Sequence, residues 1–600
     1  METMKKTTFV IILALAAPAG ATVQERADDF LRAYSAYYQG LYAVTQEADW
    51  AASTDVTPEH DGARVAANKA VASFTGNPLA IEKTRELLKH EDELDDSSMR
   101  QLRRVWLAAA ENPGDIPETV SKRVVAESRQ SSAMDSFEFC VERSTDGKAC
   151  AKPVTANEID EVLQSTSASL EVKRRYWTAA KEIGVGLKPG LVELRGLRDE
   201  VARHFGYKDY FDLQVASYGM STEEMSSMLD GLLKDVEPLY KQLHCYTKYE
   251  LAKRYHEPVP KGLIPAHWLG NRWSQEWPGI VQGVDLDPLF KDKSPEWIVK
   301  QAEAFYVSMG FDKLPEAFWK KSDLYPVPKG SSRKKNTHAS AWHMDLDRDV
   351  RSLMSVEPNS EWFTTAHHEL GHIYYFRSYS RPGVPLLLRD GANRAFHEGT
   401  GDLIAIAANQ EPYLREIGVL PKDQKIDRNR WLLDQALTQT IVFLPWSAGV
   451  MSHWERDVYA KDLPASEWNK RWWDYVAKFQ GVEPPGPRDA ESCDACTKTH
   501  INDNPAYYYT YAIGTVYKYQ VHDYICRAIL HQDPRSCNYY GHKEVGDFLK
   551  SILEKGATED WRKLLREKTG SDLTTKPMMD YFAPLMDYLK AENAGRQCSW

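Results

Sequence analysis

The chain of 600 residues is 42% hydrophobic and 27% charged, so it has enough apolar sequence to bury a large core and does not read as a disordered protein. Its formal net charge is −11, and its densest basic run is the short "GSSRKK" at 330–335. A nucleic-acid-binding surface needs clustered Lys and Arg, so no nucleic-acid partner is expected.

The N-terminus has the three parts of a secretory signal peptide. A lysine pair precedes an apolar run of about a dozen residues, and Ala19-Gly20-Ala21 supplies the small residues that signal peptidase needs. The apolar run is too short to span a bilayer, which takes about 20 residues. We therefore predict a signal peptide at 1–21, no stable membrane anchor, and an exported chain in the periplasm or outside the cell.

Apolar residues recur at intervals of three and four over most of the mature chain, which is the helical period. The pattern covers residues 24–126 and 157–253, where Gly and Pro separate the predicted helices, and it returns towards the C-terminus. "THASAWHMD" at 337–345 predicts instead a short extended segment. Without a Pro/Ser/Gly-rich linker or an internal repeat, the sequence predicts one large, mostly α domain at 22–600 with few short strands. The oligomeric state is open, and a monomer is compatible with the sequence.

Eight cysteines suit an oxidising compartment. "CDAC" at 493–496 could be a tight disulfide, a redox pair or half of a metal site, and the absence of a second such pair favours the disulfide. Cys245 and Cys598 either pair with each other or stay free. Two further pairs would close short polar loops as disulfides, namely Cys140 with Cys150 and Cys526 with Cys537.

The segment "AHHELGHIYY" places His368 and His372 four residues apart, with Glu369 beside the first. One α-helical turn takes about 3.6 residues, so the two imidazoles share a helix face and can bind one cation. Zinc suits such ligands, and in catalytic sites it usually keeps three protein ligands and one water. Zinc makes that water acidic, and a carboxylate such as Glu369 can then take its proton. The pattern is short, so the alternative is two helical histidines with ordinary hydrogen-bond partners.

A third ligand is available downstream, in "RDGANRAFHEGTGDLIAIAA". This stretch begins as a Gly-rich turn and continues with helical spacing, which places Glu398 and Asp402 four residues apart near a helix start. Glu398 can complete a His, His, Glu set on zinc, and Asp402 can orient a ligand imidazole through its second nitrogen. The alternative is an acidic helix N-terminus, where negative charge is favourable in any protein.

Further stretches extend these motifs along the chain: "ADWAASTDVTPE", "GLIPAHWLGNRWSQEWPGI", "THASAW", "KFQGVEPPGPR", "KTHINDNPAYYYTY" and "YFAPLMDYL". In combination with the two histidine segments, they resemble the angiotensin-converting enzyme family of zinc peptidyl dipeptidases. The resemblance covers nearly the whole mature chain. It implies a helical ellipsoid with a deep central channel, and release of C-terminal dipeptides from oligopeptides. The interval between His372 and Glu398 is slightly longer than is usual in the family, and we expect the connecting loop to absorb the difference.

The resemblance also implies roles for single residues. His368, His372 and Glu398 match the zinc ligands, Glu369 matches the general base and later proton donor, and Asp402 matches the carboxylate behind a ligand histidine. The other matches are His500 and Tyr511 for stabilising the oxyanion, Gln275, Lys498 and Tyr508 for binding the substrate carboxylate, and His338, Ala339 and Ala341 for contacting the peptide. A preorganised donor such as the Tyr511 hydroxyl is typically worth about 3 kcal/mol in the barrier.

The choice among the tyrosines at 507–511 requires a one-residue insertion after His500, and for most of these rings packing of a helix start is the alternative. His338 also has an alternative, a buried histidine bonded to a neighbouring backbone group.

Gln275 in "WSQEW" sets the expected step size. The branch of the family that removes single residues resembles this chain except for an arginine at this position, so we expect dipeptides. Val476 and Thr510 stand where animal members have chloride-binding arginines. Without a guanidinium there is little to offset the cost of desolvating chloride, so a chloride requirement is not expected. The chain has no Asn-X-Ser/Thr sequence, which with the lysine-led signal favours a bacterial, periplasmic protein.

Three alternatives compete with a zinc peptidyl-dipeptidase. One is a single-residue carboxypeptidase of the same family. Another is a catalytically silent relative that binds peptides, which would gain nothing from keeping Glu369. A purely structural zinc is the third, but such sites usually have four closed ligands and no adjacent base.

Overall fold

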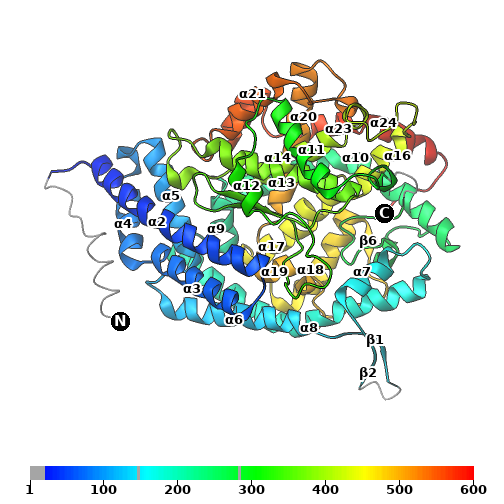
Figure 1. Ribbon diagram of the computed structural model, residues 1–600. Coiled ribbons are helices and arrows are strands. Elements are labelled where there is room, and N and C mark those ends of the chain that lie inside the picture. Colours follow the sequence, from blue (N-terminus) through cyan, green and yellow to red (C-terminus); the bar gives the residue numbers. More distant parts are fainter. Residues whose placement is uncertain (1–19, 145–148, 281–285, 439) are drawn as a thin grey trace. The chain divides into compact units, whose positions relative to one another are not determined.

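A computed structural model describes residues 20–144, 149–280, 286–438 and 440–600. Most of these residues form helices, and the few strands are short (Figure 1). The predicted mostly α fold class is therefore confirmed. The predicted signal peptide at 1–21 lies, apart from its last two residues, outside the described part of the chain.

The chain divides into two compact units, each assembled from three separate segments. The first unit holds Met1–Val120, Leu286–Lys422 and Val521–Leu573, and the second holds Ser121–Asp285, Asp423–Gln520 and Thr574–Trp600. Neither unit is a continuous stretch of chain, so this division does not cut the sequence into successive domains. The single domain at 22–600 stays a prediction.

Helices dominate the described residues of the first unit, and the two strands found among them form one antiparallel pair. The helices are α2 (Val23–Thr54), α3 (Pro58–Thr75), α4 (Pro78–Leu88), α5 (Asp96–Glu111), α11 (Pro295–Ser308), α12 (Glu316–Lys321), α13 (Ser360–Tyr379), α14 (Arg394–Ala408), α15 (Glu411–Glu416), α21 (Lys543–Leu553) and α22 (Trp561–Thr569). The strands are β4 (Ser340–His343) and β5 (Val350–Leu353), with Ser340 opposite Leu353 and His343 opposite Val350. The extended segment predicted at 337–345 therefore contains a strand.

The second unit holds the longest helix of the described chain and two further strand pairs. Its helices are α7 (Ala156–Gln164), α8 (Leu170–His204), α9 (Tyr210–Ala216), α10 (Thr222–Tyr255), α16 (Arg428–Thr438), α17 (Ser452–Tyr459), α18 (Trp468–Tyr475), α19 (Thr499–Asp503), α23 (Lys576–Tyr581) and α24 (Ala583–Glu592). Strands β1 (Phe139–Arg143) and β2 (Cys150–Val154) pair antiparallel, and β3 (Ile264–Pro265) and β6 (Val482–Glu483) pair parallel. Helices α6 (Pro117–Asp135) and α20 (Tyr509–Tyr524) run across the segment boundaries.

Helices α8 and α10 correct the prediction that Gly and Pro separate the helices between 157 and 253. Helix α8 continues through Pro189, and α10 continues through Pro238. Both prolines lie on exposed faces. There, water can satisfy the backbone carbonyl that a proline leaves without its helical N–H partner, which lowers the cost of continuing the helix.

Three disulfides join Cys140 with Cys150, Cys245 with Cys598, and Cys493 with Cys496. The predicted Cys526–Cys537 disulfide is not formed in the structure, where both residues are buried thiols. The Cys526 thiol instead hydrogen-bonds with Cys537, and its sulfur lies 3.6 Å from Nε2 of His522. The short sequence separation correctly predicted that the two cysteines lie near each other. It could not predict that they stay reduced beside the His522 ring.

In the described part of the chain, no helix has the length and apolar character needed to cross a membrane. The N-terminal helices of the first unit are instead amphipathic. Their apolar faces meet in a core that includes Phe30 and Tyr34 of α2, Phe74 of α3 and Leu102 of α5.

Candidate active site

Helix α13 carries the predicted metal-binding pair. The side chain of Asn359 caps its start by accepting a hydrogen bond from the backbone N–H of Trp362. One turn apart on this helix, His368 and His372 bring their Nε2 atoms to 3.1 Å from each other. The second helix of the site, α14, is capped in the same way by Asn393 and presents Glu398 from its first turns.

Two glycines let α13 and α14 approach closely. A Cβ at Gly371 would lie 2.9 Å from the Cα of Gly401, and a Cβ at Gly401 would lie 2.9 Å from Cε1 of His368. Real Cβ atoms do not tolerate such contacts, so larger residues would push the helices apart or displace the imidazole. The close crossing allows the short Glu398 side chain to reach both histidines.

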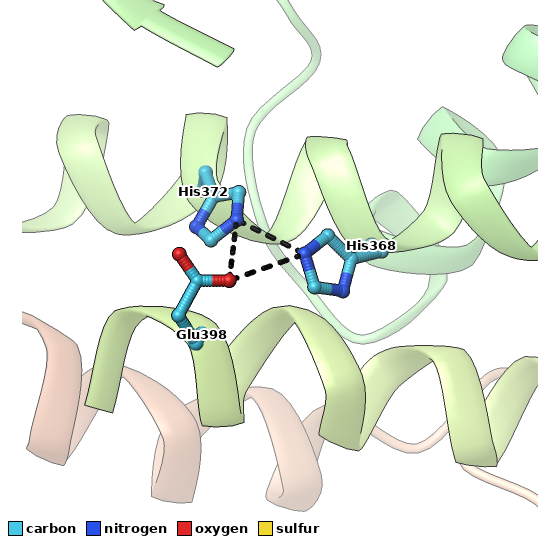
Figure 2. Close-up of side chains that lie close together, drawn as sticks. All are labelled: His368, His372 and Glu398. Carbon is cyan, nitrogen blue, oxygen red and sulfur yellow. Dashed lines mark hydrogen bonds and ion pairs between the residues drawn. The ribbon is translucent and has the colours of Figure 1, made fainter. Parts of the chain in front are cut away.

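The three predicted ligands converge (Figure 2). One ligand atom from each of His368, His372 and Glu398 lies within 4.8 Å of the others. Oε2 of Glu398 is 3.8 Å from Nε2 of His368 and 3.9 Å from Nε2 of His372. Tetrahedral ligands at about 2.1 Å from zinc lie about 3.4 Å apart, so this donor set and its spacing fit a zinc ion.

Each ligand histidine has a partner on its other ring nitrogen. Nδ1 of His368 is 3.1 Å from Oδ1 of Asp402, as predicted for a carboxylate behind the ligand. Nδ1 of His372 is 3.0 Å from Nδ1 of His397, a residue that our sequence reasoning missed. Both contacts suit rings whose Nδ1–H donates, which leaves the Nε2 lone pairs free to bind a cation.

His397 is held by aromatic packing. Its ring centroid is 4.4 Å from that of Tyr375 and 5.0 Å from that of Phe376. Its Nε2 is buried and has no hydrogen-bond partner among the described residues. Burial lowers the pKa of His397 to about 3, so the ring is neutral and its Nδ1 can accept a hydrogen bond from Nδ1–H of His372. In the sequence, the one feature that could have indicated a role for His397 is its position directly before the ligand Glu398.

Burial and neighbouring charges shift the pKa values of the groups in the histidine motif. Burial raises the pKa of Glu369 to about 7, the positive charge of His368 opposes this rise, and the negative charge of Glu398 adds to it. For His368, burial lowers the pKa, but the hydrogen bond to Asp402 and the surrounding carboxylates outweigh burial and raise it to about 9.

Strand β4 lies against helix α13. The ring of His343 stacks on Phe376 at 5.1 Å, and its Nε2 is 3.2 Å from Oγ of Ser380, at the helix end. The predicted peptide-binding residues belong to this segment. Ala341 lies within β4, opposite Ser352, whereas Ala339 and the exposed His338 precede the strand. In the described chain β4 pairs only with β5, so its other edge has no strand partner among these residues.

In the second unit, the structure brings together the three residues predicted to bind a carboxylate. Nζ of Lys498 donates a hydrogen bond to Oε1 of Gln275 at 3.0 Å and lies 5.6 Å from the ring centroid of Tyr508. The same ammonium lies 4.2 Å from the ring centroid of Trp273, which the sequence reasoning also missed. Burial, followed by the charge of Arg272, lowers the pKa of Lys498 to about 8.

His500 lies beside the predicted catalytic tyrosine. Its ring centroid is 5.0 Å from that of Tyr508 and 6.2 Å from that of Tyr511. Tyr509 instead packs against Phe211. Burial and then the charge of Lys498 lower the pKa of His500 to about 4, so at neutral pH the ring is uncharged. Tyr508 and Tyr511, rather than Tyr509, therefore lie beside His500, and their roles in catalysis and binding stay predictions.

Comparison with known proteins agrees with the geometry. The profile of the peptidase family described as "Angiotensin-converting enzyme" matches residues 21–600. The angiotensin-converting enzyme of Theromyzon tessulatum is 29% identical over 586 residues, which cover 93% of this chain and 92% of that protein. The enzyme of Rattus norvegicus is 28% identical, with 96% of this chain and 44% of that protein covered. The angiotensin-converting enzyme-like protein Ace3 of Mus musculus is 31% identical over 73% of this chain and 60% of its own length. The chain thus spans less than half of the rat relative.

Proposed function

We infer that the chain, which belongs to the angiotensin-converting enzyme family, is a zinc metallopeptidase that releases dipeptides from the C-terminal end of oligopeptides. The observation that carries this function is the convergence of His368, His372 and Glu398, with the buried carboxyl group of Glu369 beside the first histidine. When bound there, zinc would act as a Lewis acid on the scissile carbonyl and acidify water.

The residues around the metal site supply the proton chemistry. We propose that Glu369 takes a proton from the attacking water and later gives it to the leaving amine, because its buried carboxyl group lies directly beside the ligand His368. Asp402 and His397 would hold the two ligand histidines in the required orientation. Tyr511 and the uncharged His500 would donate hydrogen bonds to the developing oxyanion. In support, Nδ1 of His500 is buried and has no partner among the described residues.

Substrate binding is proposed to use two features. The edge of β4 away from β5, at Ala339 and Ala341, would pair with the peptide backbone, with His338 nearby. The terminal carboxylate would bind to Lys498, Gln275 and Tyr508. The buried Lys498 ammonium forms no salt bridge with a carboxylate among the residues that the structure describes, so it would gain most from a charged ligand. Since Gln275 leaves the room that an arginine would fill, we propose dipeptide rather than single-residue release.

The test is the product pattern of an N-terminally blocked peptide, followed by mass spectrometry. The wild-type protein should release dipeptides, stop with a metal chelator and recover with zinc. Glu369→Gln should lose about 10²- to 10⁴-fold in kcat while still binding zinc and peptide. Its matched control is Glu361→Gln, at an exposed position in the first turn of the same helix. Sequential loss of single residues would support the carboxypeptidase alternative. Full peptide binding without any turnover would support the silent relative.

We also propose that chloride is not required. The Thr510 hydroxyl is hydrogen-bonded to that of Tyr218 at 2.8 Å, so an uncharged pair occupies this position. Val476 lines a small cavity that Arg272 also lines, but the Arg272 guanidinium is already paired with both carboxylate oxygens of Asp160, each at 2.8 Å. An NaCl titration at fixed ionic strength should leave kcat/KM nearly constant, whereas a many-fold rise would contradict the proposal.

Three disulfides fit a protein that works in an oxidising, extracellular environment. We propose that the chain is exported to the periplasm or secreted. Fractionation of expressing cells, with N-terminal sequencing of the mature chain, tests both the location and cleavage before Thr22.

A further inference from the structure

The Cys493–Cys496 disulfide closes the turn that leads directly into Lys498 and His500. Its two cysteines are three positions apart, and they flank the start of the 3₁₀ turn η8 (Ala495–Thr497). Helix α19, which contains His500, begins at Thr499, two residues after the last residue of this turn. The cross-link therefore restricts the backbone immediately before two residues of the proposed substrate site.

The whole turn is buried and anchored. Cys493, Asp494 and Cys496 are all 0% exposed. The Asp494 carboxylate accepts hydrogen bonds from Arg488 and from Nε1 of Trp473, the latter at 2.8 Å. Helix α8 packs directly on this turn at Gly184, where a Cβ would lie 2.1 Å from the carbonyl oxygen of Cys493. The turn has no room to shift towards α8.

The side chain of Asn502 links the backbone of the turn to the backbone of Lys498. Nδ2 of Asn502 donates to the carbonyl oxygen of Cys496 at 2.9 Å and to that of Lys498 at 3.0 Å. Oδ1 of Asn502 accepts from Nε2 of Gln130 at 2.8 Å, which fixes the orientation of the amide. Backbone atoms of the cross-linked turn and of Lys498 thus share one buried donor.

We propose that the Cys493–Cys496 disulfide positions the Lys498–His500 segment, acting through Asn502, so that the Lys498 ammonium meets the substrate carboxylate. Cys493 and Cys496 are then positioning residues and take no part in the chemistry. Any effect of the disulfide on substrate preference rests on the proposed function, in which Lys498 binds the substrate carboxylate. The placement of the segment can be measured independently of that role.

The first experiment compares one peptide in two forms, with a free C-terminal carboxylate and with a C-terminal amide. Wild-type protein should prefer the free acid in kcat/KM. Cys493→Ala with Cys496→Ala should reduce this preference by about ten-fold or more, mainly through KM for the acid, because a shift of about 1 Å in a positioning group is enough for such a loss. The matched control removes the Cys140–Cys150 disulfide of the β1–β2 pair with the same substitutions and should keep the wild-type preference. An unchanged preference in the first double variant would overturn the proposal.

Hydrogen exchange of the backbone amides of residues 498–502 provides the readout that does not depend on catalysis. The Cys493/Cys496 double variant should exchange faster there than both wild-type protein and the control, and equal exchange would also overturn the proposal. If the wild-type enzyme shows no preference for the acid, the carboxylate role of Lys498 fails, while the exchange result still decides the positioning role. Should the double variant not fold, Asn502→Ala keeps the disulfide and removes its link to Lys498. This variant should show the same loss of preference and faster exchange, and wild-type behaviour in it would contradict the proposal.

Discussion

The proposed role of Lys498 makes the pH dependence of substrate recognition predictable. Burial lowers the pKa of this ammonium from 10.5 to about 8, so the charge that would attract the substrate carboxylate is lost as the pH rises through 8. A group with a pKa of about 8 is about 90% charged at pH 7 and about 10% charged at pH 9. We therefore expect kcat/KM for a free-acid peptide to fall about ten-fold between these two pH values.

The free-acid peptide and its C-terminal amide form the matched pair for this assay. Changes in Glu369, Tyr511 or the metal site affect both substrates, so the ratio of their kcat/KM values isolates the carboxylate contact. This ratio should fall with an apparent pKa near 8. In Lys498→Arg the guanidinium stays charged, and the fall should disappear from this range even if the absolute rate is lower.

A variant without the Lys498 charge shows how much this charge contributes to kcat/KM for the free-acid peptide. Lys498→Met should cost about 2–3 kcal/mol in the barrier for the free acid, or about 30- to 150-fold in kcat/KM, and little for the amide. A ratio that stays flat from pH 7 to pH 9 in the wild-type enzyme, or an equal loss on both substrates in Lys498→Met, would refute this reasoning.

Two further predictions concern the metal site and the packing of helix α8. Asp402→Ala and His397→Phe each remove the partner of a ligand histidine, so zinc affinity should fall about 10- to 100-fold in a chelator competition, and unchanged affinity would contradict the orienting role. Gly184→Ala places a methyl group against the Cys493 carbonyl and should lower the free energy of unfolding by about 1–3 kcal/mol, whereas Gly186→Ala, in open space on the same helix, should raise it by about 0.5–1 kcal/mol. Thermal unfolding of the two variants measures both signs, and equal melting temperatures would contradict the packing argument.

The parts of the metal site that could be predicted from sequence are those set by spacing within one helix. His368 and His372 share a face of α13 because they lie one turn apart, and the same spacing links Glu398 with Asp402 on α14. His397 could not be predicted in this way. Its contact with His372 joins two helices and depends on how they cross, which no single helical period encodes.

Predictions from short sequence patterns also failed where solvent exposure or residues distant in sequence determine the structure. Gly and Pro predicted breaks within 157–253, yet α8 passes Pro189 because the residue faces water. Trp273 lies next but one to Gln275 in sequence, but only the folded chain reveals that the ammonium of Lys498 lies over its ring. Sequence spacing predicts the ligands of a site well and the groups that surround them poorly.

The crossing of α13 and α14 explains why an unusual loop length does not disturb the metal ligands. From the resemblance, we expect the loop after α13 to be slightly longer than is usual in the family, and Oε2 of Glu398 lies 3.9 Å from Nε2 of His372. The distance between the helices is set at Gly371 and Gly401, where the backbones touch, and not by the length of the chain that connects them. Extra residues can therefore enter the loop without moving Glu398, whereas one added methyl group at Gly401 would meet the His368 ring. For this site, the two glycines constrain the geometry more tightly than the loop does.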